Sequence, residues 1–176
     1  MKSFKLLVAA ILLLSIIVVS CSNDDDTPGV TIIPVTMTVD VDALLAANLP
    51  ADTEVSAFAN FGQAGGISNA DFLTEVGFGE RVSWQATSAS SATDEILFTA
   101  IIDDDFLLDG YTQLVVPDGE DDLYYEAPQP LFIREVVTTP VVDSTLKYSI
   151  YFNVVRNNII SANYLVDPKI KIKSTN

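Results

Sequence analysis

Strict alternation of apolar and polar side chains marks the segment Lys147-Tyr148-Ser149-Ile150-Tyr151-Phe152-Asn153. Successive side chains of a β-strand point to opposite faces of a sheet, so this pattern predicts a strand with one buried and one solvated face. The same period of two recurs in Arg81-Val82-Ser83-Trp84-Gln85-Ala86, which places Trp84 in the core, and in Lys169-Ile170-Lys171-Ile172-Lys173. We expect the lysines of the last segment to lie on an edge strand, where they discourage edge-to-edge pairing.

Further segments rich in β-branched or aromatic residues are bounded by Gly or Pro. They are Thr31–Val41, Glu54–Phe61, Glu95–Ile102, Thr112–Val116, Leu131–Val137 and Ile159–Val166. About eight or nine strands at this spacing predict an all-β fold, a single antiparallel β-sandwich of jelly-roll or Ig-like type. Pro34 indicates that the first strand is an edge strand or is bulged. At most a short helix is expected, near residues 43–48, with Asp42 as its cap and Pro50 beyond its end.

A basic and then apolar segment opens the chain. Lys2 and Lys5 precede the apolar run Leu6–Val19, which ends at Ser20 and Cys21. The run has about fourteen residues, or roughly 21 Å as a helix, whereas a membrane span needs about twenty residues. We therefore interpret residues 1–20 as a cleaved signal peptide.

The processing site has a recognisable form. The residues Val18-Val19-Ser20-Cys21 resemble the lipobox of bacterial lipoproteins, although that family usually has Leu where Val18 stands. The resemblance implies that Cys21 is acylated and becomes the first residue of the mature protein. The alternative is an ordinary secretory signal with a free thiol at Cys21.

The residues that follow the cysteine suggest a destination. Ser22-Asn23-Asp24-Asp25-Asp26 resembles the serine-plus-acidic export tag of surface lipoproteins of the Bacteroidota, with Ser22, Asp24, Asp25 and Asp26 as its residues. This resemblance implies a lipid-anchored position in the bacterial outer membrane, with the domain facing outward. The membrane is then a partner through Cys21.

The mature chain reads as one tethered domain. Residues 21–29 form an acylated cysteine with a flexible acidic tether, and Ser22–Gly29 spans at most about 26 Å when fully extended. Residues 30–176 form the β-sandwich domain, without an internal repeat or a second linker. This length suffices for a sizeable core without disulfides.

Net charge excludes some partners. The signal carries two lysines and no acid, so the mature chain has seven basic and 24 acidic residues and a formal charge of −17. Nucleic acid and anionic lipid headgroups are poor partners for such a surface.

Missing residue types exclude most catalytic sites. The chain has no histidine, and its one cysteine is Cys21, so a Ser-His-Asp triad, a Cys-His pair and a histidine-ligated zinc each lack a necessary group. No Walker loop is present, and Gly62 with Gly65-Gly66 lacks dinucleotide-binding spacing. We therefore expect no enzyme and no cofactor. A glycoside hydrolase that uses two carboxylates is the alternative, but nothing in the sequence selects a pair.

Two binding interpretations remain for the residues 118–126. Asp118 and Asp122 would be the first ligands of a structural calcium ion, because calcium takes several carboxylate oxygens; the alternative is a solvated loop tip. Tyr124 and Tyr125 lie between acids and would form a platform for a sugar ring; the alternative is that they are buried in a strand.

Two short passages resemble a known family. Val76–Trp84 with Thr87-Ser88, and Tyr164–Ile170, are similar to a glycine-strand-Trp passage and to the closing strand of the AidA/PixA inclusion-body protein family. The resemblance implies a β-sandwich without catalytic residues. Those proteins are generally not lipoproteins, so the N-terminus departs from the family.

These observations favour a surface-exposed, outer-membrane-anchored lipoprotein with a non-catalytic binding domain. Its function would be adhesion or capture of a ligand, with a glycan or a protein as that ligand. The alternative is a structural component of the envelope or matrix that acts by protein–protein assembly.

Overall fold

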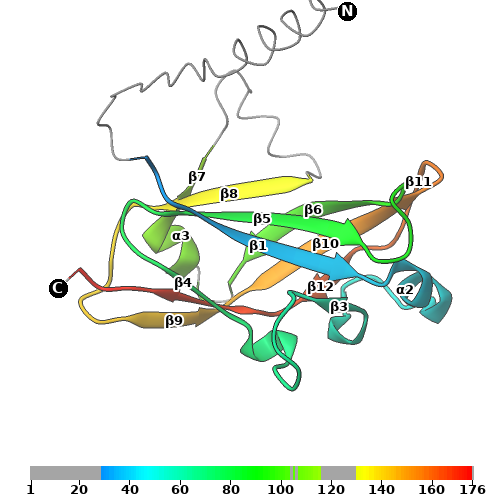
Figure 1. Ribbon diagram of the computed structural model, residues 1–176, viewed down its shortest axis with the longest axis horizontal. Helices are drawn as coiled ribbons and strands as arrows, with labels where there is room; N and C mark the ends of the chain where they lie inside the picture. The colour runs from blue at the N-terminus through cyan, green and yellow to red at the C-terminus, as the bar shows by residue number, and fades with distance from the viewer. Residues whose placement is uncertain (1–28, 104, 106, 116–129, 176) are drawn as a thin grey trace, which may run out of the picture.

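A computed structural model describes residues 29–103, 105, 107–115 and 130–175. These residues are mainly β, as predicted, with short helices between the strands (Figure 1). The strands are β1 (Ile32–Val39), β2 (Thr53–Glu54), β3 (Ala59–Asn60), β4 (Leu73–Val76), β5 (Arg81–Ser88), β6 (Glu95–Ile102), β7 (Thr112–Leu114), β8 (Leu131–Val136), β9 (Ser144–Lys147), β10 (Ser149–Arg156), β11 (Ile159–Ile160), β12 (Tyr164–Val166) and β13 (Lys169–Ile172). The helices are α2 (Val41–Ala47) and α3 (Leu107–Tyr111), with 3-10 turns η1 (Ser56–Phe58) and η2 (Asn69–Asp71). The described residues contain thirteen strands, more than the predicted eight or nine, and three of them, β2, β3 and β11, are only two residues long.

The strands form three sheets. One has the order β3-β1-β5-β8-β7, the second has β11-β10-β12-β2 with β6 also paired to β10, and the third has β4-β13-β9. In Figure 1 the layer of β1, β5 and β8 lies across the layer of β6 and β10. The core lies between these layers, where Phe98 of β6 packs edge-on against Phe132 of β8.

The prediction of a purely antiparallel sandwich is wrong. β1 runs parallel to β5 from Ile32 opposite Arg81 to Val39 opposite Ser88. β12 with β2, and β13 with β4, are also parallel pairs. A parallel pair needs a long crossover connection, and the segment between β1 and β5 supplies one that contains α2 and three short strands.

In the final strand, β13, the predicted buried and solvated faces are confirmed, but the predicted position at the edge of a sheet is wrong. Ile170 and Ile172 are fully buried, and the lysines point outward. However, β13 lies between β4 and β9 and is not an edge strand. Its lysines bind acids on neighbouring segments: Lys169 binds Asp71, Lys171 binds Asp143, and Lys173 approaches Glu75. These ion pairs explain the lysines on a central strand.

The short helix was predicted within two residues, but its cap differs. α2 begins at Val41, and the Asp40 side chain accepts a hydrogen bond from the Ala43 backbone N–H at 3.1 Å. Asp40 therefore caps the helix, and Asp42 instead binds Arg156. The helix ends at Asn48, whose φ of 47° is left-handed, as is common where a helix stops.

Pro34 has the position that its chemistry requires. It pairs with Ser83 of β5 on one side, while β3 meets β1 only at Thr38 and Val39. Pro34 therefore lies where β1 is an edge among the described residues, as predicted, and its missing N–H interrupts no described ladder.

Trp84 is buried, as predicted, and carries a polar contact that joins two sheets. Its indole N–H donates to the Tyr148 hydroxyl oxygen at 2.9 Å, and the two rings meet edge-on with centroids 5.9 Å apart. Burial raises the pKa of Tyr148 above its ordinary range, so the phenol stays neutral.

We predict that Tyr148→Phe lowers the free energy of unfolding by about 1–3 kcal/mol, because the buried indole N–H loses its partner. Urea unfolding followed by the fluorescence of Trp84, the sole tryptophan, measures the change. Tyr151→Phe is the control, since Tyr151 is partly exposed, and should change stability by less than about 0.5 kcal/mol. Equal losses in the two variants would show that the Trp84 contact contributes nothing.

Candidate functional site

The residues predicted to carry function lie outside the described part of the chain. These are Cys21, Ser22, Asp24, Asp25, Asp26, Asp118, Asp122, Tyr124 and Tyr125. The lipidation, export, calcium and sugar-stacking assignments therefore stay predictions. The site is built here from the residues that the structure describes.

Asp103 belongs to an acidic run, yet it is buried and organises α3. Its two carboxylate oxygens accept the backbone N–H groups of Leu107 at 2.9 Å and of Leu108 at 3.1 Å. Asp109 in the same helix binds Arg134 of β8. The sequence pattern predicted neither role, because a helix of five residues is too short to show a periodic pattern.

A polar hollow lies beside Asp103. It consists of two adjoining cavities of about 190 and 280 Å³, and Asp103 and Lys147 line both. Lys147 Nζ lies 3.0 Å from an Asp167 carboxylate oxygen, and the Ser149 hydroxyl donates to the other oxygen at 2.7 Å. The remaining polar lining comes from Asp105, Ser144 and Thr145.

This polar hollow combines carboxylate, ammonium and hydroxyl groups on one surface. Such a set bonds well to a ligand that is itself rich in hydroxyl groups. The aromatic ring in the lining is Tyr148, which is buried and already holds Trp84. The described part of the hollow therefore supplies hydrogen bonds without an exposed stacking platform.

An apolar hollow of about 200 Å³ lies at the β10–β11 hairpin. Leu45, Val154 and Ile159 line it. Ile159 and Ile160 of β11 are 72% and 63% exposed. The turn before them consists of Asn157 and Asn158 with φ of 53° and 62°, the left-handed pair that closes a tight hairpin.

Arg156 joins this hairpin to two other segments. Its guanidinium donates to both carboxylate oxygens of Asp94 at 2.7 Å, and it binds Asp42 of α2 at 2.7 Å. The Asp94 side chain is 1% exposed, and the hydrogen bonds from Arg156 hold the pKa of that carboxyl below its ordinary value. This network joins the end of β10 to α2 and to the residue that precedes β6.

Every basic residue after residue 20 takes part in an ion pair. The seven are Arg81, Arg134, Lys147, Arg156, Lys169, Lys171 and Lys173. Each of these cations is thus paired with an acid, and the chain as a whole stays strongly negative. A polyanionic ligand would meet repulsion without a free basic cluster to offset it.

The described residues contain no group of three or more acidic or cysteine side chains placed to hold a metal ion. No helix in the described ranges is long and apolar enough to cross a membrane.

Comparisons with known proteins give a weak likeness in fold alone. No family model matches the sequence, and no curated protein matches it. The fold is similar to the crystal structure of an inclusion body protein (PixA) from Burkholderia cenocepacia J2315, with 13% sequence identity and a TM-score of 0.49. The match covers 84% of this chain and 99% of that chain. This neighbour has the family name that the sequence resemblance gave, and it assigns no function to the chain.

We predict that Asp143 stabilises the fold above pH 4 and loses this effect toward pH 2. Hydrogen bonds from Lys171 and Ser174 lower the pKa of Asp143 from 3.8 to about 2, so the folded state prefers the charged carboxylate. Above pH 3.8 this preference is fully present, and it disappears as pH falls through the folded pKa. The stability difference between wild type and Asp143→Asn, measured by urea unfolding from pH 6 to pH 2, should therefore shrink below pH 4. A difference that stays constant over this range would contradict the assignment.

Proposed function

We propose that this chain is an acylated lipoprotein of the bacterial outer membrane whose β domain faces outward and captures a ligand without catalysis. One observation carries the proposal. A basic and apolar leader ends at Ser20-Cys21, and the ordered β fold begins at Ile32, eleven residues after the cysteine. A short polar segment between a processing cysteine and a folded domain is what a lipid-anchored domain needs.

Absent residue types support a binding role over catalysis. No histidine is available as a general base near neutral pH, and the one cysteine is assigned to the lipid. Three carboxylates line the polar hollow, and two of them already have structural partners: Asp103 accepts backbone N–H groups and Asp167 binds Lys147. Asp105 is the third, so the described lining does not supply two uncommitted carboxylates for the glycoside hydrolase alternative.

A glycan is the ligand class that the polar hollow favours. Hydroxyl groups of Ser144, Thr145 and Ser149 lie beside carboxylates and an ammonium group in a cavity large enough for a sugar ring. The charge of −17 disfavours anionic polymers, so a neutral glycan is the better fit. Tyr124 and Tyr125, outside the described residues, are the predicted stacking platform for the same ligand.

A structural role in the envelope or matrix is the second candidate. The observation that favours it is the exposed pair Ile159 and Ile160 on the two-residue strand β11. Adjacent exposed isoleucines on a strand beside an apolar hollow are typical of a protein-binding edge. Concentration-dependent assembly without ligand would favour this function.

We predict that Cys21→Ala abolishes acylation, because the thiol that carries the lipid is removed. The variant should accumulate as an unprocessed or soluble form. Phase partitioning in detergent and metabolic labelling with a fatty acid measure this. Continued partitioning of the variant with detergent would contradict the lipid anchor.

We predict that a neutral glycan raises the midpoint of thermal unfolding, because binding to the folded state stabilises it by about 2.7 kcal/mol at a hundredfold excess over Kd. A panel of polysaccharides identifies the ligand. Asp105→Ala, in the lining of the polar hollow, should weaken the shift.

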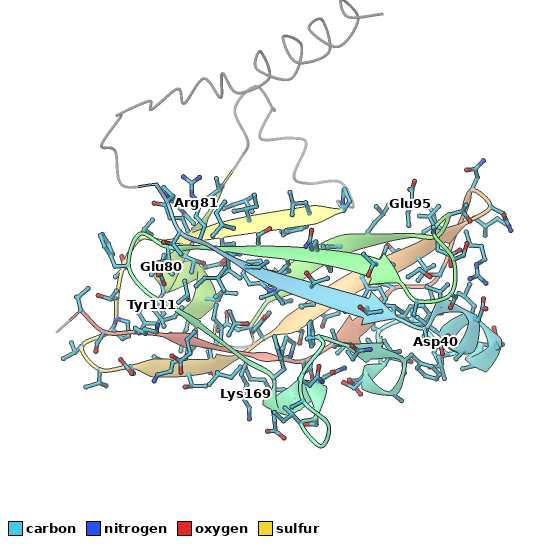
Figure 2. All side chains as sticks on the ribbon, viewed as in Figure 1. Asp40, Glu80, Arg81, Glu95, Tyr111 and Lys169 are labelled. Atoms are coloured by element: carbon cyan, nitrogen blue, oxygen red, sulfur yellow. The ribbon has the colours of Figure 1, made fainter. Side chains whose placement is uncertain are left out.

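Glu95→Ala is the matched control, since it removes the same charge at the start of β6, whereas Asp105 comes after the end of that strand. Figure 2 shows Glu95 on the right. No shift with any glycan, or equal effects of the two variants, would reject the polar hollow as the binding site.

A further inference from the structure

Strand register gathers four segments at the end of the domain where the chain enters. Ile32 starts β1 opposite Arg81, so β1 begins beside the β4–β5 turn. The backbone N–H of Gly79 donates to Val136 at the end of β8, and that of Lys173 donates to Val76 at the end of β4. We call this the tether end; it comprises residues 29–32, 77–81, 136–143 and 172–175.

Both figures show this arrangement. In Figure 1 the start of β1, the β4–β5 turn, the β8–β9 connection and the C-terminus gather on the left, and α2 and β11 lie on the right. In Figure 2 Glu80, Arg81 and Tyr111 lie on the left, and Asp40 lies on the right. The ion pair of Arg156 with Asp42 places the β10–β11 hairpin at that far end.

Exposed apolar side chains come from three of the four segments of the tether end. Val141 is 92% exposed, Val142 is 71% exposed and Phe78 is 61% exposed. Val30 and Ile32 are also exposed. Three separate connections thus present large apolar groups to solvent at the end where the chain enters, which marks an interaction surface.

We propose that the tether end docks on the lipid bilayer, with Phe78, Val141 and Val142 inserted at the membrane interface. This inference rests on the proposed lipid anchor at Cys21. Only eight residues, Ser22–Gly29, separate the acylated cysteine from Val30, so the tether end stays within about 26 Å of the bilayer. Tethering makes the contact intramolecular, so a weak apolar interaction is enough to hold it.

The apolar groups, and not charge, drive this docking. The mature chain has a formal charge of −17, and Arg81 and Lys173 at the tether end are already paired with Glu135 and Glu75. The described cations at the tether end are therefore not available to attract anionic headgroups. Docking should occur on zwitterionic lipid and should resist added salt.

Position-specific fluorescence tests the proposal. The acylated protein is reconstituted into zwitterionic phospholipid vesicles that contain a lipid-borne quencher. A polarity-sensitive fluorophore is attached at Val142→Cys in one variant and at Ile160→Cys in the other, while the native thiol is occupied by lipid. Both positions are exposed and apolar, but they lie at opposite ends.

We expect the label at position 142 to shift to the blue and to be quenched severalfold more than the label at 160. Adding Phe78→Asp and Val141→Asp to the Val142→Cys protein should reduce the quenching while the protein still floats with the vesicles. These side chains are exposed, so the fold should tolerate the change.

Three results would overturn the inference. Equal quenching at both positions in protein that floats with vesicles would reject docking and leave the anchor intact. Failure to float would reject the anchor and the docking together. A blue shift of the label at 142 that grows with protein concentration in the absence of vesicles would show that the tether end binds a second copy of the chain.

Discussion

The parallel pairing of β1 with β5 determines the layout of the whole domain. Its eight-residue register, from Ile32 opposite Arg81 to Val39 opposite Ser88, places the entry of the chain beside the β4–β5 turn. The crossover that a parallel pair requires carries α2, β2, β3 and β4. β3 extends the sheet of β1 and β5, whereas β2 and β4 join the two other sheets. This one pairing therefore determines the end of the domain at which the described chain begins.

Local patterns predicted the faces of the strands but not their partners. The alternation around Trp84 and Tyr148 identified core residues, because period two depends on the strand alone. It does not say which strand lies alongside, so the parallel pairs and the central position of β13 were missed. The roles of Asp103 and Asp40 were missed for a related reason: a cap depends on a few hydrogen bonds at one position, and a neighbouring Asp offers the same signal.

Charged, apolar and polar side chains occupy different parts of the described surface. All seven cations after residue 20 take part in ion pairs, and the excess of acids leaves a net negative charge that disfavours anionic partners. Apolar groups at the tether end lie near the expected lipid, whereas Ile159 and Ile160 lie at the far end, where a partner from outside can reach them. The polar hollow near Lys147 holds the hydrogen-bonding groups to which we propose that a glycan binds.

The central claim is that a lipid-anchored domain stands on its tether end and presents its far end outward. Amide hydrogen exchange tests this most directly. It is measured on the acylated protein bound to vesicles and on the unacylated domain in solution without detergent. The account predicts slower exchange on vesicles in residues 137–143 and 77–80, with unchanged exchange in residues 88–94 and 157–160. Protection at the far end, or no difference at either end, would contradict it.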